Sequence, residues 1–554
     1  MSKVRAQWGG VVIFWLAPLM IVFVAVWRAL PYLSMPPEAR LLAASQPGGW
    51  ANLAVWAVVI LVNLLAAWLI WQKYGLICPS GVYWRYLLAL AVGCGLLVGV
   101  VVREIGPGKP GAWNVFYLAP DSASYIQPYS AHTSRPPVYP LFIDIVAGRG
   151  FDHTFDDSLV NKPLMIVDHP LLRVVRLQKA LLVAAILLAC YALMRFLVTP
   201  LPAVLFLLLQ DFNFFGTEVD YVLSDTLAMV FLLLILAVFL EMVREASFVK
   251  GEVSPEGKKP FSPSLAHPWK QLRFPVIGVL CALLYLTRPA GVYGVALLGM
   301  GALWLLITGW RINWRNVLLG LALAAGLVSV PPLYVYFETG NLSPAPLYAV
   351  SRAAFALQVA QPSDVSLMPD VRSREFLERA LERKKTTDAE IRQQYQNDPV
   401  WVHWYSILSN SHTAMITLRD MQPPATGIEG TKILQNASAI LLRQHFLDYL
   451  RLSWYSFQIE TGVLNRLDPF LRHFGIPTFW YAVGLFLALA LWLRGKEGFV
   501  VVSFFLTHFT NLVIVALFDL PTQRYSGATE HLLLLAVLVL AAEASRRFIR
   551  KPVS

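Results

Sequence analysis

Long apolar runs, separated by polar turns, dominate the chain. A membrane-spanning helix needs about 20 mostly apolar residues. Candidate spans of roughly this kind cover residues 8–30, 53–71, 86–102, 174–198, 202–215, 223–242, 276–287, 291–307, 317–336, 478–493, 499–518 and 532–544. Residues 202–215 and 276–287 are short for single spans and are interpreted as helices broken by Pro or Gly. The pattern predicts an all-α polytopic membrane protein with about twelve transmembrane helices.

Two long polar segments, 103–173 and 338–476, interrupt the apolar runs. In the second, alternating charges along residues 372–396 predict a solvated surface helix. Residues 440–457 mix large apolar side chains with charged ones, and this predicts an amphipathic helix lying on the membrane surface. The chain therefore divides into N-terminal spans (1–102), a first outer loop (103–173), a central bundle (174–337), a second outer loop with amphipathic helices (338–476) and C-terminal spans (477–554).

Composition and charge support a membrane protein and orient it. Only 14% of the residues are charged, against about 25% in soluble domains. The net charge of +11 comes from basic clusters in loops between apolar runs, as the positive-inside rule requires, and so does not indicate nucleic-acid binding. The basic clusters predict cytoplasmic termini and put both long segments outside, on the periplasmic face if the membrane is a bacterial inner membrane. The 251–268 segment is then a cytoplasmic linker.

The first outer loop contains the most distinctive polar stretch, which reads P-D-S-A-S-Y-I-Q-P-Y-S-A-H-T-S-R-P-P-V-Y-P over residues 120–140. Proline fixes its own φ and restricts the preceding residue, so this loop is expected to have a defined shape. Its candidate functional residues are Asp121 for catalysis and Tyr125, Arg135 and Tyr139 for substrate binding. The alternative is an ordinary interfacial loop whose polar side chains meet water and headgroups.

Other outer turns also carry charged residues. Glu218 and Asp220 lie close together in one turn, and Arg524 and Tyr525 lie in the last one. Arg288 stands between apolar helices, where it either pairs with an anion or extends to lipid headgroups. Arginine can hold a phosphate at fixed geometry. Ser224 and Asp225, at the head of a helix, are interpreted as capping residues.

Four stretches together resemble the GT-C fold glycosyltransferases that use polyprenyl-phosphate sugars, a group that includes protein mannosyltransferases and lipid A aminoarabinose transferase. They are P-D-S-A-S-Y with R-P-P-V-Y-P, Y-V-L-S-D-T-L, L-T-R-P-A-G-V and Q-R-Y-S. The resemblance implies that Asp121 is the catalytic base and that an arginine such as Arg288 or Arg524 holds the lipid phosphate. The chain has Asp121-Ser122 where many members carry two adjacent acids.

The residue chemistry fits the same activity. A sugar leaving a lipid phosphate has a good leaving group, so the enzyme needs a carboxylate to deprotonate the acceptor and cations for the developing phosphate charge. Direct attack with one base would invert the anomeric carbon. We therefore expect an inverting membrane glycosyltransferase that moves a sugar from a polyprenyl-phosphate carrier to an outer-face glycan, lipid or protein, with Glu218 and Asp220 as further catalytic candidates.

Two other functions remain open at this stage. A transporter or flippase for lipid-linked saccharides would also need an apolar groove and outer arginines. An oligosaccharide ligase would likewise have its active site at the outer face. The first outer loop also holds His132, His153 and His169 among several aspartates, but their spacing matches no recognisable metal site. No cofactor is expected, and the bilayer, the lipid-linked donor and the acceptor are the expected partners.

Overall fold

The computed structural model describes fourteen stretches of the chain and a few further helical residues. They are 116–119, 121–130, 135–148, 151–160, 162, 164, 169–197, 221–251, 268–308, 314–340, 346–395, 399–425, 427–460 and 495–518, followed by 529, 532–533, 535–536, 538–540 and 543. The spans expected at 8–30, 53–71, 86–102, 202–215 and 478–493 lie outside the described residues, as does nearly all of the 251–268 linker. The described part is mostly helical, and its β pairing amounts to three isolated bridges.

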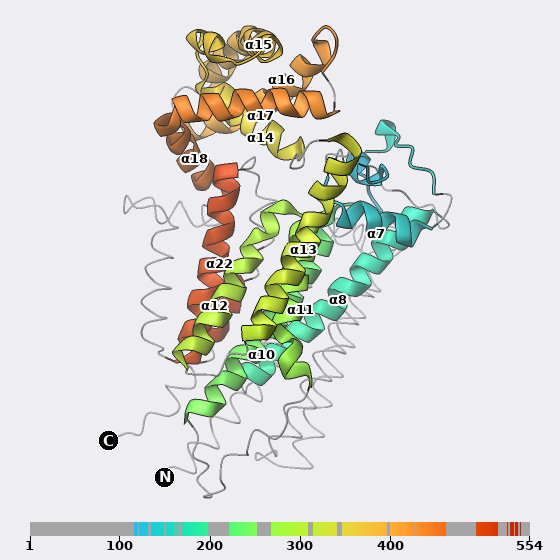
Figure 1. Cartoon of the computed structure of the whole chain (residues 1–554), viewed down its shortest axis with the longest axis vertical. Helices are drawn as coiled ribbons and strands as arrows, with labels where there is room; N and C mark the ends of the chain where they lie inside the picture. Colours follow the sequence, from blue (N-terminus) through green and yellow to red (C-terminus); the bar gives the residue numbers. More distant parts are fainter. Residues whose placement is uncertain are drawn as a thin grey trace, which may run out of the picture.

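A bundle of long helices forms the larger part of the described structure (Figure 1). Its members are α8 (Pro170–Leu197), α10 (Ser224–Gly251), α11 (Pro268–Thr287), α12 (Gly294–Ile307), α13 (Trp314–Thr339) and α22 (Lys496–Phe518). Among the described residues, three stretches are long and apolar enough to cross a membrane: Ser224–Arg244, Trp314–Glu338 and Lys496–Phe518. These confirm helices at three of the expected spans and support a membrane protein. The expected number of twelve is not tested by the described residues.

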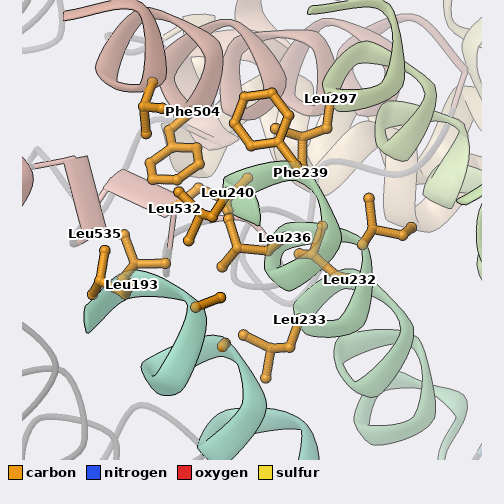
Figure 2. Close-up of a cluster of buried hydrophobic side chains, with 14 of the residues drawn as sticks. Leu193, Leu232, Leu233, Leu236, Phe239, Leu240, Leu297, Phe504, Leu532 and Leu535 are labelled. Carbon is orange, nitrogen blue, oxygen red and sulfur yellow. The ribbon is translucent and has the colours of Figure 1, made fainter. Parts of the chain in front are cut away.

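The bundle is held together by a large apolar core around α10. Between Leu227 and Leu240 this helix is apolar on all sides, which is typical of a helix surrounded by others. Figure 2 shows Leu232, Leu236, Phe239 and Leu240 of α10 pointing into a cluster with Leu193 of α8, Leu297 of α12, Phe504 of α22 and Leu532 and Leu535 near the end of the chain. Burial of one such side chain contributes about 1.5–3 kcal/mol.

The helices α11 and α13 cross with their backbones in close contact. A Cβ atom added at Gly278 would lie 2.3 Å from the carbonyl oxygen of Gly320, and one added at Gly320 would lie 2.5 Å from that of Phe274. Small residues permit such close approach between membrane helices. On its other sides α13 exposes large apolar residues, among them Leu318, Leu321, Val330 and Leu333, which suits a helix facing hydrocarbon.

We predict that Gly320→Ala destabilises the fold. The added methyl group would overlap the Phe274 carbonyl, and overpacking of this kind costs about 1–3 kcal/mol. Gly326→Ala is the matched control, because it lies on the same helix and its Cβ would meet nothing within 4 Å. The expected result is a lower Tm in detergent for Gly320→Ala and an unchanged or higher Tm for Gly326→Ala. Equal Tm values for the two variants would contradict the close crossing.

A second group of helices lies at one end of the bundle (Figure 1). It comprises α14 (Pro346–Val359), η6 (Pro362–Leu367), α15 (Val371–Tyr395), α16 (Pro399–Asp420), α17 (Gly427–Gln444) and α18 (Phe446–Glu460). We call this group the cap domain, and the end of the bundle beneath it, where α10 begins and α11 and α22 end, the site end. The domain has its own core, which includes Phe355, Phe376, Leu377, Ile407 and Leu441. The second long polar segment is thus largely a folded helical unit.

Two helix predictions fall in the cap domain. The charged helix expected at 372–396 is present as α15, which buries Phe376 and Leu377 on one side and exposes charges on the other. The single surface helix expected at 440–457 is wrong, because α17 ends at Gln444 and α18 begins at Phe446. The physical reason is that Leu441 and Leu442 are buried in the domain core, while the intervening His445 turns toward Asp364, with Nε2 2.9 Å from its Oδ2.

A buried histidine joins three helices of the cap domain. The Gln358 side-chain carbonyl of α14 lies 2.8 Å from Nδ1 of His403 in α16. The Ser456 hydroxyl of α18 lies 2.7 Å from Nε2. A carbonyl oxygen only accepts, so Nδ1 carries the proton and Nε2 accepts from Ser456. Burial lowers the pKa of His403 to about 3, because charging it would require desolvating an imidazolium.

This burial predicts acid sensitivity between about pH 6.5 and pH 3. The unfolded chain binds the proton with the ordinary pKa of about 6.5, so the folded state loses roughly 1 kcal/mol for each pH unit below that value. His403→Gln should flatten the pH dependence of Tm between pH 7 and pH 5. His412→Gln, which changes an exposed histidine of the same helix, should leave it as in the unmodified protein. Identical slopes in all three proteins would show that His403 does not carry this linkage.

Candidate functional site

The first long polar segment (103–173), which the charge pattern predicts to be an outer loop, is packed in its described part against the site end of the bundle. Residues 116–118 form isolated bridges with Leu164, Tyr221 and Val160. The loop continues through the short helix α6 (Ser122–Ile126) to α7 (Val138–Ala147), and α6 is anchored by the Ser122 hydroxyl, which donates to the Val222 carbonyl at 2.9 Å. Phe116, Ile126, Ile143, Leu172 and Val222 share one apolar core. The expectation of a shaped loop is therefore confirmed for its described residues.

An ion pair fixes the two ends of the motif. Nη2 of Arg135 donates to Oδ1 of Asp121 at 2.8 Å, and Nε donates to the Ser124 hydroxyl at 2.7 Å. The guanidinium carbon lies 4.6 Å from the centre of the Tyr125 ring, within cation–π distance. Arg135 is buried, whereas 38% of the Asp121 side chain is exposed. The predicted site residues Asp121, Tyr125 and Arg135 are thus brought together. The Asp121 carboxylate is partly exposed, and the Arg135 guanidinium is buried beside it.

Tyr125 and Tyr139 link the loop to the bundle. The hydroxyl groups of Tyr125 and Ser224 are 2.8 Å apart, and the two tyrosine rings meet edge to face with their centres 5.2 Å apart. The Tyr139 hydroxyl donates to Gln178 Oε1 at 2.9 Å, and the Gln178 amide donates to the Tyr221 carbonyl at 2.9 Å. Tyr139 is completely buried, so its contribution is to hold the loop rather than to present a surface to a substrate.

A second ion pair lies deeper in the site end. Nη1 of Arg288, in the turn after α11, donates to Oδ1 of Asp225 in the first turn of α10. About nine-tenths of each side chain is buried, so Arg288 does not extend to lipid headgroups. The capping interpretation of Asp225 is incomplete, since its carboxylate also holds this arginine. A signal was present in the sequence, because a lone arginine between apolar helices needs an acid on a neighbouring helix.

Tyr293 is a further residue of this site that the sequence did not indicate. It lies in the turn η5 (Pro289–Tyr293), its side chain is 1% exposed, and it interacts electrostatically with both Arg288 and Asp225. Among the described residues, no group forms a hydrogen bond with its hydroxyl. Because Ser224 and Asp225 are adjacent, the Tyr125–Ser224 contact joins the two ion pairs into one polar site.

The acid-rich stretch after α7 forms local turns. Asp152 accepts from the backbone N–H and the hydroxyl of Thr154, both at 3.0 Å, and Asp156 accepts from the Ser158 N–H at 2.8 Å. These hydrogen bonds hold the pKa of each carboxyl below its usual range. His153 contacts the Ile126 carbonyl at 2.6 Å. Within the described ranges, no three His, Cys, Asp or Glu residues are grouped as metal ligands.

Four predicted site residues, Glu218, Asp220, Arg524 and Tyr525, lie outside the described residues. Those that are described, Asp121, Tyr125, Arg135, Tyr139 and Arg288, all lie at the site end. Chemically, the site offers the partly exposed carboxylate of Asp121, held in one orientation by Arg135. Deeper in the site, the buried Arg288 interacts with the buried phenol of Tyr293. Comparisons with protein-family models, curated proteins and solved structures find no match to this chain.

Proposed function

We propose that this protein is an inverting membrane glycosyltransferase that transfers a sugar from a polyprenyl-phosphate carrier to an acceptor at the outer face of the membrane. The observation that carries the proposal is the Asp121 carboxylate, partly exposed and fixed by Arg135 at the end of an apolar helical bundle. The bundle gives a long lipid an apolar surface to lie along. The carboxylate then stands where the lipid headgroup would meet an acceptor at the outer face.

The reaction needs few groups. The acceptor hydroxyl gives its proton to Asp121, its oxygen forms the new bond to the anomeric carbon, and the bond from that carbon to the phosphate oxygen breaks with its electrons on the phosphate. A positioned base contributes typically 10²–10⁴-fold to such a step. Positive groups stabilise the charge that develops on the leaving phosphate. Attack opposite the leaving group inverts the anomeric configuration.

Each proposed site residue has a role in this scheme. Arg135 orients Asp121 through their ion pair, and the Tyr125 ring supports the Arg135 guanidinium. Arg288, with Arg524 and Tyr525, would bind the donor phosphate, and Glu218 and Asp220 are the alternative acids. We place the protein in the plasma membrane, the bacterial inner membrane if the source is bacterial, with cytoplasmic termini, the site outside and a GT-C-like bundle of about twelve helices, as the charge pattern and the motifs favour.

The test compares cells that lack this protein with cells that contain it. The expected result is the loss of one sugar from an envelope glycan, lipid or protein, together with accumulation of the polyprenyl-phosphate sugar at the outer face. Purified protein in proteoliposomes should then transfer that sugar. Accumulation of the donor on the cytoplasmic side, without transfer by the purified protein, would instead identify a flippase. Loss of a whole oligosaccharide from the acceptor would identify a ligase.

A further inference from the structure

The helix α18 lies antiparallel along the outermost part of α22. The Tyr449 hydroxyl donates to the carbonyl of Leu517, one residue before the end of α22. Eight residues further along α18, the Phe457 ring meets the Phe509 ring of α22, eight residues earlier in that helix, with centres 5.8 Å apart. The two contacts fix both the direction and the register. At 1.5 Å per residue, α18 descends about 12 Å beside α22 between them.

This register puts half of α18 level with the membrane-spanning part of α22. The helix α22 is one of the three that are long and apolar enough to cross a membrane. Phe457 packs with Phe505, Phe509 and Leu512 of α22, and stacks on Trp454 with ring centres 5.6 Å apart. Trp454 is therefore level with a position about 9 Å inside the end of α22. The helix descends into the level of the apolar layer instead of lying across its surface.

One side of α18 is apolar and exposed from Phe446, just beyond the end of α22, down to Trp454. Phe446 is 54% exposed, Leu447 80%, Leu450 41% and Trp454 42%. Residues four apart lie on one side of a helix, so these four form a continuous stripe. The other sides are different, because Tyr449 contacts Phe355 of the cap domain and Leu517 of α22, Ser456 contacts His403, and Asp448 is an exposed charge. An apolar stripe of this size facing water would be costly.

We propose that this stripe, Phe446–Leu447–Leu450–Trp454, is a lipid-binding surface that inserts the cap domain into the leaflet on its own side of the bilayer crossed by α22. The continuity of α18 with α22 identifies the occupant, since lipid surrounding α22 at this level would also meet the stripe. Trp454, a residue type enriched at membrane interfaces, lies at the inner end of the stripe. Arg451 is exposed and donates from Nε to the Tyr455 hydroxyl at 3.1 Å, so its guanidinium is held along the side of α18 next to the stripe.

The proposal gives the cap domain a second attachment besides its packing on α22. Ser456 of α18 forms a hydrogen bond with His403 of α16, in the core of the cap domain. Lipid bound to one side of α18 is therefore linked to the cap-domain core on the other side of that helix. A domain attached in this way stays close to the membrane surface at the site end. This inference does not depend on the proposed transferase activity, because it rests on helix register and exposed apolar area alone.

Site-specific photo-crosslinking tests the proposal in the full-length protein. The photoreactive residue p-benzoylphenylalanine is placed at position 447 or 450, in proteoliposomes of phosphatidylethanolamine and phosphatidylglycerol. The matched control carries it at position 448, where Asp448 is exposed on the polar side of the same helix. All three positions are exposed, so folding is not at risk. After irradiation, mass spectrometry identifies what has been captured.

We expect phospholipid adducts at positions 447 and 450 and none at position 448. Peptide adducts at 447 and 450, from residues 461–494 or from a second copy of the chain, would overturn the proposal by identifying a protein occupant. Equal lipid capture at all three positions would also overturn it, because no particular side of α18 would then face the bilayer. The absence of any adduct at 447 and 450 would show that the stripe faces water.

Discussion

If Asp121 is the base of the proposed glycosyltransferase, Asp121→Asn is expected to slow sugar transfer at least about a hundredfold, the usual scale for losing a positioned base. The amide oxygen of asparagine can still accept from Arg135, which donates to Asp121 Oδ1 at 2.8 Å, so the geometry of the motif should be retained. The amide cannot take the acceptor's proton. Turnover of the labelled donor in proteoliposomes should therefore collapse, while binding of the donor lipid stays unchanged.

The control for this experiment is Asp152→Asn. Asp152 is another exposed acid of the first outer loop, but its carboxylate only closes a local turn with Thr154. Transfer by that variant should match the unmodified protein. Near-normal transfer by Asp121→Asn would move the role of base to Glu218 or Asp220. Loss of both donor binding and transfer, with an unchanged Tm, would make Asp121 a binding residue instead.

The first outer loop shows what local sequence can predict. Asp121 and Arg135 are fourteen positions apart, and the prolines around them limit the shapes that the connection can take. Tyr125 is close to Asp121 along the chain, so its presence near the pair followed from the same motif. The apolar runs at α10, α13 and α22 were equally readable, because spanning a bilayer requires length and apolarity, and both are local properties.

The parts that the sequence did not predict depend on contacts between distant segments. Asp225 and Arg288 are 63 residues apart, and each has a plausible local explanation, as a helix cap and as a residue at the membrane surface. Only the packing of α10 against α11 brings them together. The same applies to Tyr293, which from sequence alone reads as another apolar-helix residue. The sequence pattern did not predict a packed core in the cap domain, because that core contains many alanines, such as Ala353, Ala354 and Ala380, which carry little apolar signal.

Burial also changes what an arginine substitution measures. Arg288 and Asp225 are each about nine-tenths buried, and removing one partner of a buried pair costs roughly 3–5 kcal/mol, because the other charge is left without compensation. Arg288→Ala should therefore lower the Tm in detergent strongly, and its loss of transfer would reflect misfolding. The variant cannot by itself separate a structural role from phosphate binding.

Exchanging the two charges separates these roles. In the double variant Asp225→Arg with Arg288→Asp, the pair is kept but the cation moves from the end of α11 to the head of α10. We expect most of the Tm lost in Arg288→Ala to return, since the buried charges again compensate each other. If Arg288 holds the donor phosphate, donor affinity should remain weak, because the cation now lies on the wrong helix. Recovery of donor affinity along with the Tm would show that Arg288 serves the fold alone and that Arg524 is the phosphate ligand to test next.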